Sequence, residues 1–264
     1  MIKSYFSAFR MRWKMETQYR GAALGGILCQ IFFGLILVAL YRALYAGKPQ
    51  ALPLNAVVSY VWIQQCCFRI VTSSEAGILD SVMTGQIAYE LCRPLNLYGY
   101  YFVRDMAYKI VGCGMRAVPM LIFAILLPEG WGISAPASLP GLLLMFAAIF
   151  LGLLCACALD NINMAATMKT LDNRGVSAML NLLSVSLSGN ILPLTLFPDS
   201  WQKVITLLPY AQMLDAPIRL YTGEWAVSQA PRVLLIQGIW VIILVSFGAF
   251  LWRQNEKRVI VQGG

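Results

Sequence analysis

The chain has 264 residues, of which 59% are hydrophobic and 12% are charged, and its formal net charge is +8. Soluble proteins carry about a quarter charged residues, so this composition excludes an ordinary soluble domain. The absence of histidine excludes His-based proteolysis and His-rich metal sites. A mean hydropathy of +0.68 indicates an integral membrane protein, and the positive charge fits anionic lipid better than nucleic acid.

Residues 1–19 have the pattern of a helix lying in a membrane interface. Apolar residues recur there at spacings of three and four, and basic residues fall on other faces; the two sets are Ile2, Tyr5, Phe6, Phe9 and Trp13, and Lys3, Arg10 and Lys14. The aromatic side would face acyl chains and the basic side headgroups. The alternative is a tail held to the membrane by charge alone.

Six stretches approach the length of about 20 residues that a spanning helix needs. Five carry no Asp, Glu, Lys or Arg, namely Gly21–Tyr41, Pro49–Phe68, Gly130–Leu159, Gly175–Pro198 and Val233–Trp252. The third in chain order, about Tyr101–Leu127, is interrupted by Arg104, Asp105, Lys109 and Arg116. Six such spans occupy about 120 residues, so we expect an all-α polytopic fold in a single membrane domain, residues 1–264, with no room for a soluble catalytic domain.

The distribution of Lys and Arg sets the expected orientation. With the N-terminus inside, the outer segments hold only Arg42, Lys48, Lys203, Arg219 and Arg232, whereas most of the 20 basic residues fall on the inner side. This asymmetry follows the positive-inside rule. We therefore expect both termini to be cytoplasmic.

Two inner connections are expected. The first, Arg69–Tyr100, is the longer one, and its residues 74–95 predict a short helix, a turn at Thr84-Gly85 and a second short helix that Pro94 stops. The second is expected over Asp160–Arg174.

The stretch after the fifth span is broken by prolines. Its apolar positions have a helical period but are too short to span, so residues 198–224 predict short helices at the outer surface, partly re-entrant. The interrupting residues include Pro193, Phe197, Pro198 and Pro209. Irregular backbone at that depth is tolerated only where protein or a water-filled cavity satisfies it.

Polar residues within the spans are candidates for a substrate pathway, since lipid leaves polar groups unpaired. They are Gln64 and Gln65 in the second span and Asn181, Ser184, Ser188 and Asn190 in the fifth. Asn181, Ser184 and Ser188 recur at three and four, which places them on one helix face. They either line a cavity or hydrogen-bond between helices.

Arg116 is the most informative single residue, because it is a cation within an expected span, and we include it in the possible pathway. A cation near mid-span costs about 2.5–3.5 kcal/mol or more, so it needs a partner such as a backbone carbonyl, a lipid phosphate or another chain. The alternative is that the third span begins later and Arg116 extends to the inner surface.

The layout resembles the permease subunits of ABC transporters of the second integral-membrane type (ABC-2), in the short form made without a fused ATPase. The resemblance rests on the N-terminal interfacial (elbow) helix, the six spans, the Gly85–Leu95 run and the punctuation at Pro193-Leu194, Phe197-Pro198, Pro209 and Tyr221-Thr222-Gly223. It covers nearly the whole chain. The sequence has no G-x-x-x-x-G-K-[ST] phosphate loop, so an ATPase must be another polypeptide.

The resemblance implies an exporter subunit in a cell (inner or plasma) membrane, not itself an enzyme. Its partners would be an ABC ATPase dimer and a second permease, meeting along spans two and five, besides membrane lipids; ATP and Mg would bind to the ATPase, leaving this chain without a cofactor. A coupling segment would include Glu75, Asp80, Gly85, Ile87, Glu90, Arg93 and Pro94, and an outer gate Pro193, Phe197, Pro198 and Pro209. An alternative for Arg93-Pro94 is that they merely end a helix. A drug, lipid-like compound or peptide of amphipathic character fits the aromatic, Met and amide side chains best.

Two alternatives come from other classes. A membrane-embedded enzyme acting on lipid headgroups needs clustered carboxylates at the interface, and Asp160, Asp172 and Arg174 are the only hint of such a cluster. A secondary transporter or channel needs ionisable residues in facing spans, and only Arg116 qualifies.

Overall fold

The computed structural model describes residues 2–46, 52–72, 80–81, 84–85, 89–90, 95–170 and 174–256. Within these ranges the chain is helical and no β-strand occurs, which confirms the all-α prediction. The long helices are α1 (Ile2–Gln18), α2 (Arg20–Tyr45), α3 (Leu54–Thr72), α6 (Leu97–Leu126), α7 (Leu139–Thr170), α8 (Arg174–Leu187) and α12 (Ala230–Glu256). The short ones are α9 (Asp199–Ile205), α10 (Pro209–Met213), α11 (Asp215–Thr222) and the 3₁₀ turns η1 (Leu194–Leu196) and η2 (Val227–Gln229).

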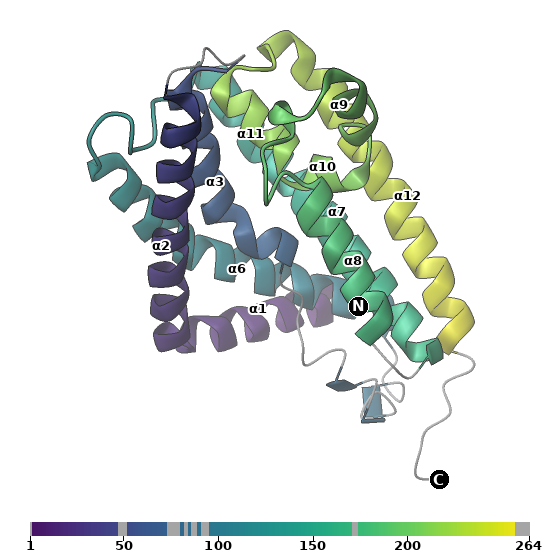
Figure 1. Ribbon diagram of the computed structural model, residues 1–264. Coiled ribbons are helices and arrows are strands. Elements are labelled where there is room, and N and C mark those ends of the chain that lie inside the picture. Colours follow the sequence, from purple (N-terminus) through teal and green to yellow (C-terminus); the bar gives the residue numbers. More distant parts are fainter. Residues whose placement is uncertain are drawn as a thin grey trace.

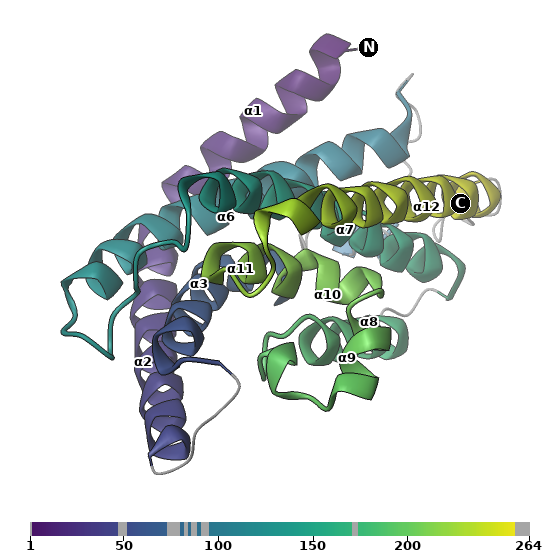
Figure 2. The ribbon, with the colours of Figure 1, turned by 90° about the horizontal axis from the view of Figure 1, so that it is seen from above.

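The helices define two ends of the molecule (Figure 1). We call the end where α2 begins and α7 and α12 stop the α1 end, because α1 lies crosswise there. Tyr19, with φ −83° and ψ 53°, breaks the helix between α1 and α2 and lets the chain turn. The other end carries the short helices, and we call it the α9 end. Seen from above (Figure 2), α1 and α9 lie on opposite sides of the molecule, with α3, α7 and α11 between them.

Among the described residues, four helices are long and apolar enough to cross a membrane: Arg20–Tyr45, Leu97–Leu126, Leu139–Lys169 and Val227–Glu256. The chain is therefore a multi-pass membrane protein. Large apolar side chains on its outer surface fit this conclusion, since soluble monomers rarely expose such patches; examples on α2 are Leu24, Leu28, Phe32, Phe33, Ile36, Leu40 and Leu44. Six spans, with α3 and α8 as the second and fifth, stay a prediction.

The expected fifth span, Gly175–Pro198, is wrong as one continuous helix. α8 ends at Leu187 after 14 residues, a rise of about 21 Å against a core of about 30 Å. Gly189 follows with φ +82°, and a Cβ at this position would collide with the Tyr60 hydroxyl. The chain therefore turns at Gly189 and continues into the short helices.

The expected boundaries of the fourth span are wrong at both ends. Residues 127–138 form a loop, and α7 begins only at Leu139. α7 then continues to Thr170, through most of the expected inner loop Asp160–Arg174. Two polar side chains of that stretch bond to the helix's own backbone: Asn161 donates to the Cys157 carbonyl at 2.8 Å and Thr167 donates to the Asn163 carbonyl at 2.9 Å.

The short helices α10 and α11 pack along α7 over about half its length. A Cβ on Gly152 would lie 2.7 Å from the Met213 carbonyl oxygen, and one on Gly141 would lie 2.8 Å from that of Leu220. Gly152 is 13 residues after Leu139, about 20 Å along the helix. The chain therefore descends to the middle of α7 at α10 and returns to the α9 end through α11.

α3 is enclosed within the chain. Fourteen of its 19 residues are buried, and it contacts α2, α6, α8 and α11. The expected meeting of two permeases along spans two and five is therefore wrong for span two, because α3 has no free face to offer. On α8, by contrast, Met179, Asn181 and Leu182 are exposed.

We predict that Gly152→Ala destabilises the protein. The added methyl group meets backbone carbonyls of α10 rather than a flexible side chain, and such overpacking costs about 1–3 kcal/mol. Thermal unfolding in detergent should show a lower Tm. Gly238→Ala in α12 is the matched control, because nothing lies within 4 Å of its Cβ position and alanine favours the helix; an equal Tm for the two variants would contradict the close packing of α10 on α7.

Candidate functional site

A buried charge cluster lies within residues 194–229, the run of short helices from η1 to η2, which we call the short-helix segment. Arg219 of α11 donates from Nε to Asp215 Oδ2 at 2.6 Å and from Nη1 to Glu224 Oε1 at 2.8 Å. Asp215 is fully buried and Arg219 is 2% exposed. The guanidinium also lies 5.1 Å from the ring centre of Trp225. Because a buried charge is costly without partners, these contacts fix the turn after α11.

Tyr60 connects this cluster to α3. Its hydroxyl donates to Asp215 Oδ1 at 2.8 Å and lies 3.4 Å from the Gly189 carbonyl oxygen. Tyr60 is buried, so the bond forms away from solvent. One side chain of α3 thereby joins the end of α8 to the start of α11.

The candidate pathway residues are brought together only in part. Gln64 donates to the Asn190 carbonyl, and Gln65, Ser184, Ser188 and Asn190 are all buried. Ser188 Oγ and Asn190 Oδ1 have no hydrogen-bond partner among the described residues. Gln64 thereby joins α3 to the end of α8, and we call these five buried residues the polar cluster.

Two candidate pathway residues lie apart from this polar cluster. Asn181 is exposed on α8, so it does not share the buried environment of Ser184 and Ser188. Arg116 lines a separate cavity at the α1 end, and neither Gln64 nor Asn190 lines that cavity.

Gln237 ties α12 to the same assembly. This fully buried side chain donates to the Ala148 carbonyl of α7 at 3.1 Å and to the Gln212 carbonyl of α10 at 2.8 Å. Trp240 adds a bond to the Leu207 carbonyl at 2.7 Å. α10 is therefore held between α7 and α12.

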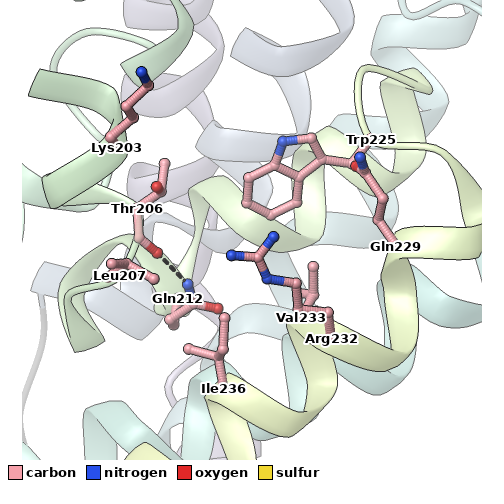
Figure 3. Close-up of a pocket in the computed structure, with 9 residues that line it drawn as sticks. All are labelled: Lys203, Thr206, Leu207, Gln212, Trp225, Gln229, Arg232, Val233 and Ile236. Atoms are coloured by element: carbon pink, nitrogen blue, oxygen red, sulfur yellow. Dashed lines mark hydrogen bonds between the residues drawn. The ribbon is translucent and has the colours of Figure 1, made fainter. Parts of the chain in front are cut away.

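An open pocket of about 350 Å³ lies between α9, α10 and α12, and we call it the α12 pocket. Its lining residues are Lys203, Thr206, Leu207, Gln212, Trp225, Gln229, Arg232, Val233 and Ile236. Figure 3 shows Lys203 on one wall, and Trp225, Gln229 and Arg232 on the other. Gln212 lies at the base and donates to the Thr206 carbonyl, while its Oε1 has no partner in the described part of the chain.

The lining of the α12 pocket combines three kinds of contact. Lys203 and Arg232 are exposed cations, Trp225 and Ile236 are apolar, and the 1% exposed Gln212 offers a free acceptor. Pockets that bind organic molecules are mostly apolar with a few placed polar groups. The lining therefore suits a molecule with an apolar body and an anionic group.

The four candidate gate residues all lie at ends of the short helices. Pro193 precedes η1, Phe197 ends it, and Pro198 precedes α9. Pro209 starts α10 and is buried. They shape the segment, and their role as a gate stays a prediction.

The candidate coupling residues are described only in part. Glu75, Ile87, Arg93 and Pro94 lie outside the described residues. Among the rest, the Asp80 carbonyl accepts the Thr84 hydroxyl at 2.7 Å, and Gly85 has φ +75°. Glu90 lies 3.8 Å from Arg104 of α6 in an ion pair.

Sequence reasoning missed most of the charged contacts. Asp215 and Arg219 are spaced i, i+4 on a helix, and this spacing is a signal for an ion pair. Nothing in the sequence around Tyr60 indicated its hydrogen bond to Asp215. Lys109, which is 1% exposed, pairs with Asp160 at 2.8 Å and donates to the Ile70 carbonyl at 3.0 Å. Asp160, the first of the three residues that hinted at a lipid-headgroup enzyme, thus serves as a structural partner between α6 and α7; Asp172 lies outside the described residues.

The described residues contain no group of three or more Cys, Asp or Glu side chains placed to hold a metal ion. The polar side chains described above instead form ion pairs and hydrogen bonds or line pockets.

The described chain is thus a helical multi-pass protein whose short helices pack beside α7 and α12, next to a pocket of mixed polar and apolar lining. A family model described as ABC-2 family transporter protein matches residues 54–262. The chain therefore belongs to the ABC-2 transporter family. Comparison with curated proteins gives no match.

Family membership makes the chain a permease of an ABC transporter. The match covers α3 and every later helix, and so includes the charge cluster, the polar cluster and the α12 pocket. Permeases of this family normally work with an ATPase subunit.

We predict that thermal stability falls as pH rises from 5 to 8, through Glu224. Burial raises the pKa of Glu224 to about 7, Arg219 opposes this rise and Asp215 adds to it. Because its folded pKa lies above the ordinary value of 4.5, the folded state binds more protons between those values, and stability is lost as pH rises through that window. Differential scanning fluorimetry across this range should show a smaller slope for Glu224→Gln; equal slopes would contradict the assignment.

Proposed function

We propose that the chain is the transmembrane subunit of an ATP-driven exporter that moves an amphipathic molecule outward across a cell (inner or plasma) membrane. A separate ATPase dimer hydrolyses ATP with its bound Mg, and this chain pairs with a second permease. It carries out no catalysis itself and binds no cofactor. Both termini and the α1 end face the cytoplasm.

The α12 pocket is the observation that carries the substrate proposal. It holds about 350 Å³, within the usual range for organic ligands. Its exposed Lys203 and Arg232 surround an apolar wall that includes Trp225. A drug, lipid-like compound or peptide with an anionic group fits this lining better than a small inorganic ion does.

The charge asymmetry of the long helices supports the orientation. α1 carries Lys3, Arg10, Arg12 and Lys14, and α12 ends beside Arg253, all at the α1 end. Under the positive-inside rule this end is cytoplasmic. The α12 pocket then lies on the outer side, where an exporter releases its substrate.

The packing of the short helices supports alternating access. α10 is held by Gln237 and by the contact at Gly152, and α11 by the charge cluster and Tyr60. A segment fixed in this way moves with α3, α7 and α12 rather than as a free loop. Rocking of the two permeases, driven by the ATPase at the α1 end, would open and close the α12 pocket.

The exposed face of α8 supports pairing with a second permease. Asn181 is a polar residue that lies among the exposed apolar residues Ala178, Met179 and Leu182 of α8. An amide exposed to lipid is unfavourable, so a protein partner would cover it.

The proposal is tested by co-purification and transport. A tagged chain should bring down an ATPase, and vesicles containing both should move an anionic fluorescent amphiphile only when ATP is supplied. Vigorous movement by this chain alone would contradict an ATP-driven mechanism.

We predict that Arg232→Gln weakens the response to that amphiphile. Arg232 is exposed, and an exposed ion pair is worth about 0.2–1 kcal/mol, so the concentration giving half-maximal stimulation of ATPase activity should rise by up to about fivefold. Arg253→Gln is the matched control, since it removes the same charge from the other end of α12. Equal effects of the two variants would mean that the α12 pocket is not the substrate site.

We predict that Glu90→Arg lowers substrate-stimulated ATPase activity at least about threefold, through lost docking of the ATPase. Because Glu90 pairs with Arg104, the swap also leaves two cations side by side. The double variant Glu90→Arg/Arg104→Glu restores that internal pair but not the docking charge. Stimulation that stays low in the double variant supports docking; full recovery would contradict a coupling role.

A further inference from the structure

A second cavity, at the α1 end, is lined by two arginines. It measures about 260 Å³ and lies where α1, α2, α3 and α6 meet. Its lining includes Glu16, Tyr19, Arg69, Tyr108 and Arg116, and we call it the arginine cavity. It is distinct from the α12 pocket, with which it shares no lining residue.

Glu16 is the one carboxylate among the residues lining the arginine cavity, and it is already shared. It accepts from Arg69 at 2.7 Å and from Arg12 at 2.8 Å. Arg116 forms no ion pair with any described residue, and its buried Nε has no hydrogen-bond partner there. Arg69 is 9% exposed, and its Nε also lacks a partner in the described chain.

Both guanidinium groups are held in fixed positions. Arg69 lies 3.9 Å from the ring centre of Tyr108, a cation–π contact. Each guanidinium group lies against a glycine, where any other residue would leave no room for it. A Cβ on Gly26 of α2 would lie 2.6 Å from Arg116 Cζ, and one on Gly112 of α6 would collide with the Arg69 guanidinium. The positive groups are therefore packed and directed at the cavity. Glu16 is the anion for Arg69, whereas Arg116 still lacks one among the described residues.

The position of the arginine cavity indicates the source of such an anion. Its lining includes Tyr19, Ala22 and Ala23, the residues at which α1 turns into the membrane-crossing α2. Tyr19 is 65% exposed, and Phe6 and Trp13 on α1 are exposed as well. Apolar and aromatic side chains of this kind gather where headgroups meet acyl chains. A ligand there can place an apolar tail against α2 and its charged group in the cavity.

We propose that the arginine cavity binds the phosphate of an anionic phospholipid, held by Arg116 and Arg69. Guanidinium groups pair with phosphate oxygens bidentately, and the cavity volume of about 260 Å³ exceeds the roughly 30 Å³ share of one water several times. The lipid compensates the charge of Arg116 and bridges α2, α3 and α6. It is a resident of the fold, separate from the transported molecule.

The test is binding of phosphatidylglycerol to the purified full chain, followed by native mass spectrometry and by the Tm in detergent. Arg116→Gln should lower the apparent affinity about tenfold or more and abolish the rise in Tm that the lipid causes. Arg10→Gln, which removes an exposed charge from α1 at the same end, should change neither. Ala23→Leu fills the arginine cavity without changing any charge and should weaken binding in the same way, which keeps the test valid if Arg116→Gln folds poorly.

Three outcomes would overturn the proposal. Phosphatidylcholine binding as tightly as phosphatidylglycerol would remove the role of net negative charge. An equal loss in Arg10→Gln and Arg116→Gln would reduce the effect to general surface attraction. Protection by inorganic phosphate or glycerol 3-phosphate equal to that of the lipid would assign the arginine cavity to a soluble anion.

Discussion

The fold depends on one buried charge cluster, in which Arg219 is held between Asp215 and Glu224 and Asp215 accepts from Tyr60. The short helices place irregular backbone beside the middle of α7, where lipid would leave its polar groups unsatisfied. Breaking a buried pair leaves an uncompensated charge, which costs about 3–5 kcal/mol. The cluster therefore restricts this segment to one arrangement on α3 and α7.

Glycines also position the short helices, because they allow close contacts between backbones. Gly152 and Gly141 let the carbonyls of α10 and α11 approach α7, and Gly189 makes room for the Tyr60 hydroxyl. A segment positioned at these separate points cannot slide along α7 without losing the buried Gln237 bonds to α7 and α10. Stability and a defined wall for the α12 pocket thus come from the same contacts.

Hydropathy predicted the all-helical membrane fold because long apolar runs have few alternatives in lipid. It failed at Gly189, where composition stays apolar but a positive φ turns the chain. It also failed at Asp160, which begins a polar stretch that stays helical and pairs with Lys109 of α6. The Asp215–Arg219 ion pair could be predicted from its i, i+4 spacing in the sequence. Tyr60 could not, since it lies 155 residues from Asp215 in the chain.

The two cationic pockets differ in the way that the two proposals, a transported molecule in one and a resident lipid in the other, require. In the α12 pocket, Lys203 and Arg232 are exposed, so water compensates their charge when the pocket is empty and a ligand gains only a modest, reversible interaction. In the arginine cavity, Arg69 is buried, Arg116 is half-buried, and both lie against glycine backbone. The one carboxylate in its lining, Glu16, is already shared by Arg69 and Arg12. Losing an anion there would expose an uncompensated buried charge. Under these proposals, releasing a ligand would cost little at the α9 end and much at the α1 end, so a permease could let its substrate go while keeping a bound lipid.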